Sequence, residues 1–173
     1  MSKINHIKAA GVLPYTYIKT DCGRNKLYFL IGTDKSNKVS DFGGKREKGE
    51  EIFDTAAREY YEESSGLLGN MEKIKKELKS DAMHTTFVIC KCYRIYLLKI
   101  DYIAELPKHY AIAKKESISS KYPSGFFEME KIKWMSATHL LKIMFDKKKI
   151  AFRLMAILRV LKHKYGNRLE KLH

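Results

Sequence analysis

Three glutamates, Glu59, Glu62 and Glu63, are spaced so that a helix would bring their side chains together. Separations of three and four residues place side chains on one helix face, so these carboxylates are expected within reach of a common point. Like charges at such spacings destabilise a helix by roughly 0.2 to 0.5 kcal/mol per pair. A bound cation would offset that repulsion, and hard carboxylate oxygens select Mg²⁺ or Mn²⁺. The cluster therefore predicts a divalent metal site.

An alternative interpretation of the same cluster is a solvated acidic helix face that binds nothing, and an isolated group of glutamates favours it. The residues around the cluster argue against that alternative. Gly44 is followed after five residues by Glu50, and after seven more by Arg58, which directly precedes Glu59. A solvated face would not require this fixed frame.

The frame resembles the Nudix box, the signature of the Nudix hydrolase family. Six positions that the family pattern specifies by identity fall in one frame, namely Gly44, Glu50, Arg58, Glu59, Glu62 and Glu63. Two positions depart from the pattern. Tyr60 stands where an aliphatic residue is usual, and the glycine expected at position 65 is displaced to Gly66. Neither departure touches a carboxylate, and the displaced glycine bears only on how the helix ends.

The resemblance implies an α/β or α+β chain folded as an α/β/α sandwich around a mixed β-sheet. It also implies an enzyme that hydrolyses phosphorus-containing acid anhydrides with Mg²⁺ or Mn²⁺ as cofactor. Glu59, Glu62 and Glu63 would be the metal ligands and catalytic residues, with Glu62 or Glu63 also orienting or deprotonating water. The carbonyl of Gly43 would complete the coordination shell.

The same resemblance assigns supporting roles to residues around the metal ligands. Glu50 and Arg58 would brace the loop and the helix. Many family members recruit one more carboxylate from a later loop, and three candidates remain open here, Glu105, Glu116 and Glu128.

Three basic residues, Lys45, Arg46 and Lys48, lie in the loop before the metal helix. They are candidates for binding the distal phosphates of a substrate. The alternative is that they are ordinary exposed loop charges.

The elements that must position this cluster can be anticipated from residue patterns. Residues 10–18 and 26–33 are rich in Val, Tyr, Phe and Ile around a turn-like segment, which predicts a β-hairpin. Residues 52–65 have helical periodicity, and residues 85–100 predict one long bent or bulged strand. A basic helix is expected at about 147–165, with Asp146 as its N-cap.

Length and composition bound the class of protein. A chain of 173 residues with 45% hydrophobic residues suits one domain over residues 1–173 and excludes a disordered chain. Three cysteines do not predict a disulfide framework, and no run of about 18 apolar residues predicts a membrane span. An intracellular, cytoplasmic protein without a membrane partner is expected.

The net charge of +14 is unevenly distributed. Residues 43–66 have a net charge of −3, whereas residues 146–173, with nine Lys and Arg against two acidic residues, have +7. A basic surface around an acidic island favours a polyanionic partner. A Lys-rich surface that only improves solubility is the alternative.

The favoured function is therefore hydrolysis of a phosphoanhydride in 5′-capped RNA, that is, mRNA decapping. Diphosphoinositol polyphosphates and diadenosine polyphosphates are competing substrates, followed by small nucleotides such as dNTPs and ADP-ribose. A non-catalytic nucleic-acid-binding module with the Nudix fold is the alternative of another class. The sequence indicates no particular protein partner.

Overall fold

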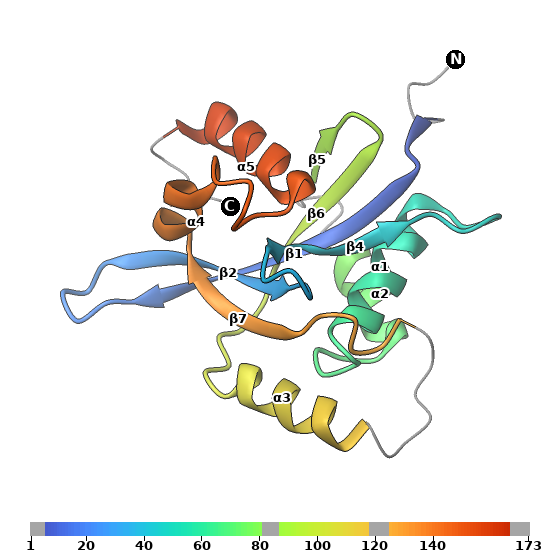
Figure 1. Cartoon of the computed structure of the whole chain (residues 1–173), viewed down its shortest axis with the longest axis horizontal. Helices are drawn as coiled ribbons and strands as arrows, with labels where there is room; N and C mark the ends of the chain where they lie inside the picture. Colours follow the sequence, from blue (N-terminus) through green and yellow to red (C-terminus); the bar gives the residue numbers. More distant parts are fainter. Residues whose placement is uncertain (1–5, 81–86, 118–124, 167–173) are drawn as a thin grey trace.

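The fold is described by a computed structural model that covers residues 6–80, 87–117 and 125–166. Its strands are β1 (Ala9–Lys19), β2 (Asn25–Thr33), β3 (Val39–Ser40), β4 (Phe42–Lys45), β5 (Phe87–Cys90), β6 (Tyr93–Lys99) and β7 (Lys131–Ser136). Together they form a seven-stranded sheet with the order β3-β2-β1-β6-β5, in which β4 also pairs with β1 and β7 with β2 (Figure 1).

Strand β1 lies at the centre of the sheet and makes it mixed. It runs antiparallel to β2 and β4 and parallel to β6. The predicted hairpin is confirmed, since β1 and β2 pair over the registers Tyr15 to Phe29 and Lys19 to Asn25. Pairing of Gly11 with Gly43 brings the segment before the box against this central strand.

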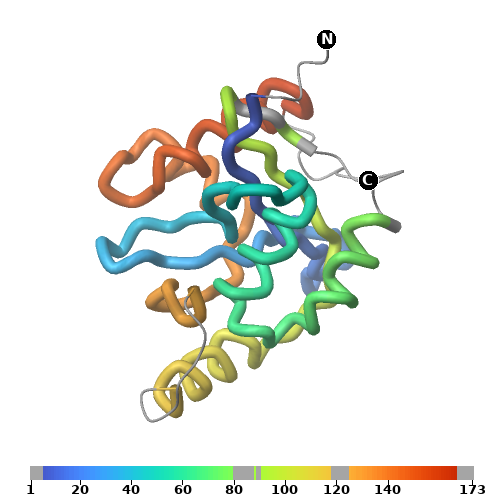
Figure 2. Tube along the Cα trace, turned by 90° about the vertical axis from the view of Figure 1, so that its right-hand side faces the viewer, coloured from blue at the N-terminus to red at the C-terminus, as the bar shows by residue number. Residues whose placement is uncertain are grey.

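Within the described ranges, five helices cover the two faces of the sheet. They are α1 (Ile52–Glu63), α2 (Met71–Ser80), α3 (Leu106–Ser117), α4 (Ala137–Ile143) and α5 (Phe152–Tyr165). In Figure 1, α4 and α5 lie at the upper left and α1 and α2 at the right, and Figure 2 shows α3 at the end away from α5. The predicted α/β/α sandwich is confirmed.

The core consists of two clusters, one on each face of the sheet, and side chains of β1 point alternately into them. Leu13 and Tyr15 belong to the cluster that packs with α4 and α5. Ala10 and Val12 belong to the cluster that packs with the other three helices. Successive strand residues point to opposite faces, so a strand covered on both sides is apolar throughout. No helix within the described ranges has both the length and the apolar character needed to cross a membrane.

Helix α1 ends where the box departs from its pattern. Ser64 caps the helix, the Ser65 N–H donates to the Glu62 carbonyl, and the Gly66 N–H donates to the Tyr61 carbonyl. These two bonds form a Schellman motif, whose residue after the cap adopts a left-handed conformation. Ser65 has φ 56° and Gly66 has φ 69°. Serine therefore adopts the backbone conformation for which glycine was expected, and the helix exit is preserved.

The C-terminal helix differs from the prediction at its start. It begins at Phe152 after Ala151, not at Lys147. The Asp146 carboxylate accepts the Lys148 N–H in a turn, and Val39 is bridged to Ile150 in parallel register. These contacts hold residues 146–151 in a turn and an extended segment, which delays the helix by five residues.

The long strand predicted over residues 85–100 is two strands. β5 and β6 pair antiparallel, with Cys90 opposite Tyr93, so only two residues form the turn. Lys91, the first of them, has φ 53°. A left-handed residue at such a turn reverses the chain, whereas a run of β-formers indicates only extended structure. Residues 81–86 lie outside the described ranges.

Tyr60 in α1 provides a test of the packing. The residue is 1% exposed, and its ring makes an edge contact with Phe42, at 5.7 Å between centroids. Within the described residues its hydroxyl is buried without a hydrogen-bond partner. Because a buried unpaired hydroxyl is destabilising, we expect Tyr60→Phe to raise the free energy of unfolding by about 1 kcal/mol, measured by urea denaturation.

Tyr110→Phe is the matched control for that measurement. Tyr110 is equally buried, but its hydroxyl donates to the Met129 carbonyl at 3.0 Å. Removing the hydroxyl in Tyr110→Phe should therefore lower the free energy of unfolding by about 1 kcal/mol. Destabilisation by Tyr60→Phe as well would show that its hydroxyl is satisfied.

Candidate active site

A cavity of about 500 Å³ lies where β4, α1 and the segment 125–128 meet. Carboxylates outnumber cations around it by five to two. Its lining consists of Gly43, Gly44, Lys45, Glu47, Arg58, Glu59, Glu62, Glu63, Gly125 and Glu128. The three glutamates singled out from their spacing are therefore brought to one cavity.

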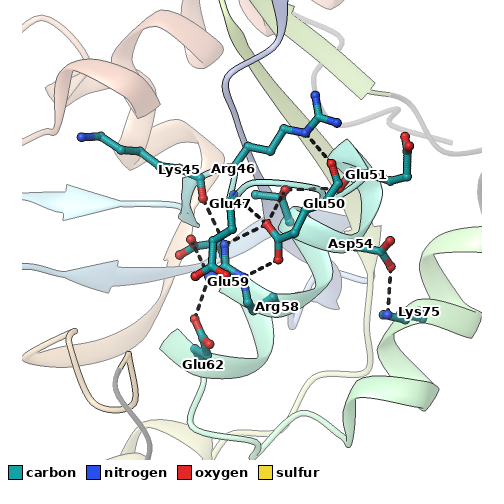
Figure 3. Close-up of polar contacts among 11 residues, drawn as sticks. Lys45, Arg46, Glu47, Glu50, Glu51, Asp54, Arg58, Glu59, Glu62 and Lys75 are labelled. Atoms are coloured by element: carbon teal, nitrogen blue, oxygen red, sulfur yellow. Dashed lines mark hydrogen bonds and ion pairs between the residues drawn. The ribbon is translucent and has the colours of Figure 1, made fainter.

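Arg58 lies at the centre of the carboxylates (Figure 3). Its Nε contacts Glu50 Oε1 at 2.7 Å, and its Nη1 contacts Glu59 Oε1 at 2.9 Å and Glu62 Oε2 at 3.0 Å. Nη2 donates to the Lys45 carbonyl at 3.0 Å. The predicted pairing of Arg58 with Glu50 is present, and Arg58 also neutralises two glutamates of the cavity.

Glu50 ties the loop to the helix. Besides Arg58, its carboxylate accepts the Glu47 N–H at 3.0 Å and the Thr55 hydroxyl at 2.9 Å. The hydrogen bond from Arg58 lowers the pKa of Glu50 to about 2, and the bonds from Glu47 and Thr55 act in the same direction. Glu50 is thus held as a carboxylate that closes the loop over the start of α1.

Glu63 is the most deeply placed carboxylate of the cavity. Its residue is 7% exposed, and its Oε2 accepts the Gly43 N–H at 2.5 Å. Burial raises the pKa of Glu63 well above its usual value, against the opposing effect of the Arg153 charge. Burial also raises the pKa values of Glu59 and Glu62, opposed by Arg58. Ionised carboxylates are therefore disfavoured here unless a cation is near.

Gly44 lies so close to the Glu59 side chain that there is no room for a side chain of its own. A Cβ atom at this position would collide with the carboxylate of Glu59. Any other residue would displace the Glu59 carboxylate from its place in the cavity. The glycine of the box is therefore explained by sterics at the wall of the cavity.

Among the three later carboxylates left open by the sequence, Glu128 is the one that lines the cavity. Its charge raises the pKa of Glu62, after the effects of burial and of Glu47. Glu105 pairs instead with Lys108 at 3.5 Å beside α3, and Glu116 lies on the same helix.

The basic loop residues lie mostly outside the cavity. Lys45 contributes to the lining, but its ammonium points away from the carboxylates (Figure 3). Arg46 donates from Nε to the Glu50 carbonyl at 2.5 Å. Lys48 is exposed in the same loop. The prediction that all three bind phosphates stays a prediction, and Lys45 is the one that the geometry places nearest to the site.

The donor set suits a hard divalent cation, although the side chains do not converge on one point. No three His, Cys, Asp or Glu side chains of the described ranges are grouped as a ready metal site. Arg58 lies between Glu59 and Glu62, and Glu63 is turned toward the Gly43 N–H. The chemistry nevertheless fits, because carboxylate oxygens in excess over cations are the ligands that Mg²⁺ and Mn²⁺ prefer.

Three further residues near the site were not identified from the sequence, namely Asp41, Tyr93 and Arg153. Asp41 is 0% exposed, and Arg153 Nε donates to its carboxylate at 2.9 Å. A charged residue within the otherwise uncharged extended segment 39–42 was the available signal. Nothing in the sequence indicated that Tyr93 and Arg153, which lie 52 and 112 positions further along the chain, would contact Asp41.

The loop brace leads to a prediction about pH. Glu50→Gln removes an ion pair with Arg58, so we expect the free energy of unfolding to fall by about 1.5 to 3 kcal/mol at pH 7. Because folding lowers the pKa of Glu50 from 4.5 to about 2, its stabilising effect is complete above about pH 4.5. The effect is lost as the pH falls toward 2. Urea denaturation at several pH values should show wild type and variant converging in acid.

Glu105→Gln serves as the control for Glu50→Gln, since it breaks an ion pair in which both side chains are more than 60% exposed. Its effect should stay below about 1 kcal/mol at every pH. A constant difference between Glu50→Gln and wild type down to pH 2 would contradict the assignment of the low pKa to Glu50.

Comparison with protein-family models gives no match. Among curated proteins, the chain is 37% identical over 81 residues to an uncharacterized protein of Acanthamoeba polyphaga mimivirus. The match covers 43% of this chain and 25% of the other protein. The chain thus spans about a quarter of the length of that relative.

Solved structures match over nearly the whole chain. A C. elegans Ap4A hydrolase in a binary complex superposes with a TM-score of 0.52 at 18% identity, covering 93% of this chain and 98% of that chain. RenU, a Nudix hydrolase from M. smegmatis, superposes with a TM-score of 0.47 at 11% identity, covering 94% and 88%. The first likeness identifies the fold. The chain therefore has the Nudix hydrolase fold, and five of the six residues that match the Nudix box line one cavity at its first helix, namely Gly44, Arg58, Glu59, Glu62 and Glu63.

Proposed function

We propose that the chain is a divalent-metal-dependent pyrophosphohydrolase. The observation that carries this proposal is the cavity at α1, where five carboxylates meet two cations. Burial raises the pKa values of three of those carboxylates. Such a concentration of negative charge is unfavourable by itself and becomes favourable when cations and the phosphates they carry are bound.

The proposed ligands are Glu59, Glu62 and Glu63, with Glu128 and the Gly43 carbonyl as further oxygen donors. A bound divalent ion would neutralise the phosphate oxygens and promote ionisation of water near neutral pH. Glu62 or Glu63 orients or deprotonates the attacking water. Glu50 and Arg58 keep the loop closed over the helix, as their ion pair at 2.7 Å indicates.

For the substrate, we infer 5′-capped RNA from the distribution of charge. The C-terminal segment from residue 146 has a net charge of +7. On α5, Arg159 and Lys162 are exposed, and the Arg159 guanidinium lies 5.3 Å from the ring centroid of exposed Phe145. Cations interleaved with exposed aromatic rings suit the backbone and bases of a single strand. The last seven residues of this basic segment lie outside the described ranges.

A diadenosine polyphosphate is the second candidate, and the likeness to the fold of an Ap4A hydrolase favours it. It would need the acidic cavity but not an extended basic surface. A panel of capped RNA, diadenosine polyphosphate, diphosphoinositol polyphosphate, ADP-ribose and dNTPs, with Mg²⁺ and Mn²⁺, separates these substrates. Hydrolysis of none, together with RNA binding, would support the non-catalytic module instead.

Substitution of single carboxylates tests the assignment of the chemistry to α1. We expect Glu62→Gln and Glu63→Gln to lower turnover by about 100-fold or more, because each loses a ligand or a base. Since folding raises the pKa of Glu63, its ionised form opposes folding at neutral pH. Glu63→Gln should therefore melt at or above the wild-type temperature without metal.

Glu105→Gln, outside the cavity, should retain turnover and provides the control for these substitutions. Activity close to wild type in both Glu62→Gln and Glu63→Gln would remove the catalytic role from this helix, whatever the substrate.

Salt dependence distinguishes a polymer from a compact substrate. Contacts to single-stranded RNA release counterions, so log affinity should fall against log salt with a slope of about −0.7 per phosphate contact. We expect affinity to rise with RNA length over several nucleotides. Arg159→Ala with Lys162→Ala should flatten the salt slope while hydrolysis of a short cap analogue is retained.

The control replaces Lys73 and Lys76 of α2, two exposed cations on the opposite face of the sheet. This double variant should keep the wild-type salt slope. If affinity is independent of RNA length and both double variants match wild type, the capped-RNA substrate is wrong and a compact polyphosphate takes its place.

A further inference from the structure

A buried ionic cluster lies behind the wall of the cavity and joins three elements. Asp41 sits between β3 and β4 and is 0% exposed. Its carboxylate accepts the Tyr93 hydroxyl from β6 at 2.5 Å and Arg153 Nε from α5 at 2.9 Å. Arg153 also donates to the Ser40 hydroxyl and to the Asp41 carbonyl, each at 3.4 Å. Its guanidinium carbon lies 4.8 Å from the Tyr93 ring centroid.

Such a cluster contributes little to the stability of the fold by itself. Removing a carboxylate and a guanidinium from water is costly, and apolar residues of similar size often stabilise a fold as well or better. The position of the cluster therefore requires another explanation. Its chain position supplies one, because Asp41 lies two residues before Gly43, whose N–H donates to Glu63.

Tyr93 connects the cluster to that backbone donor by direct packing. Its hydroxyl occupies the space beside Gly11 and Gly43, where a Cβ on either glycine would collide with it. Gly11 and Gly43 are paired across β1 and β4. The position of Gly43 is thus defined on one side by β1, on another by Tyr93, and along the chain by Asp41.

We propose that Arg153, Asp41 and Tyr93 are positioning residues for Glu63. They hold the segment from Asp41 to Gly43 so that the Gly43 N–H orients the Glu63 carboxylate at the cavity. Arg153 is absent from the residues that line the described cavity, and it acts through Asp41. The role in catalysis rests on the proposed function, whereas the effect on Gly43 and Glu63 does not. The N-terminal turn of α5 thereby becomes part of the support of the metal site.

Two substitutions separate positioning from simple electrostatics. Removing the positive charge in Arg153→Met should strengthen binding of a cation if the only effect of Arg153 is repulsion. Positioning predicts the opposite, because loss of a supporting partner typically weakens metal affinity or activity by about 10- to 100-fold. Tyr93→Phe removes one hydrogen bond without changing charge. We expect both variants to bind Mn²⁺ about tenfold more weakly than wild type in the absence of substrate.

Arg153→Lys retains the charge but loses the planar fork that contacts Asp41 and Ser40. Its Mn²⁺ affinity should therefore stay close to that of Arg153→Met. Lys75→Met is the matched control. It also removes a cation paired with an aspartate, since Lys75 Nζ lies 2.8 Å from Asp54 Oδ1, and it lies outside the cavity lining. Its Mn²⁺ affinity should equal that of wild type. For the substrate that wild type hydrolyses, Arg153→Met and Tyr93→Phe should lower kcat with KM nearly unchanged.

Hydrogen exchange of the Gly43 amide provides a readout independent of metal and activity. In the folded, metal-free variants Arg153→Met and Tyr93→Phe, this amide should exchange about tenfold faster than in wild type. Unchanged exchange and Mn²⁺ affinity, even with a lower melting temperature, would overturn the positioning role. The role would also be overturned if Arg153→Met bound Mn²⁺ more tightly than wild type and Tyr93→Phe bound it with wild-type affinity. If wild type binds no Mn²⁺ and hydrolyses nothing, the proposed function fails, and the Gly43 exchange rate alone decides the positioning role.

Discussion

Mutual repulsion of carboxylates at one cavity is the constraint on which the rest of the site depends. Glu59, Glu62 and Glu63 follow one another on the last turns of α1, and burial disfavours the ionised form of each. Arg58 offsets part of this cost from within the same helix, since one nitrogen contacts both Glu59 and Glu62. The arginine is therefore more than a brace for the loop, because it compensates charge that would otherwise oppose folding.

The surrounding elements hold that charge at a defined place. Strand β4 presents Gly44, which has no side chain to displace Glu59, and Gly43, whose N–H binds Glu63. Both glycines belong to a strand paired with β1 at the centre of the sheet. A rigid strand on one side and a helix on the other give a polar site the precision that a loop alone would not provide. Glu128, from the segment before β7, completes the acidic wall.

The departures from the Nudix box show which features of the pattern are geometric. Ser65 adopts the left-handed conformation where glycine is usual, and its hydroxyl accepts the Phe127 N–H at 3.3 Å. The hydrogen bond links the helix exit to the segment that carries Glu128. Glycine would adopt this conformation without strain, whereas Ser65 adopts it while its side chain makes a hydrogen bond that glycine could not make. Tyr60, in place of an aliphatic residue, fills the core with its ring and leaves its hydroxyl unpaired within the described residues.

The sequence by itself determined the local features of this protein. Helical spacing placed the three glutamates on one helix face, the frame around them indicated the Nudix fold, and Glu50 was expected to pair with Arg58. Such features depend on residues that are close along the chain, where backbone geometry limits the possible arrangements. The hairpin of β1 and β2 was predictable for the same reason.

Only the tertiary structure decided which distant groups meet. Three later carboxylates were equivalent in the sequence, and the path of the chain before β7 brings Glu128 to the cavity. The C-terminal helix begins at Phe152 because residues 149–151 are bonded to Val39, a contact over more than a hundred residues. The same approach carries Arg153 to Asp41. Contacts of this kind arise from the packing of sheet and helices, which patterns in neighbouring residues do not encode.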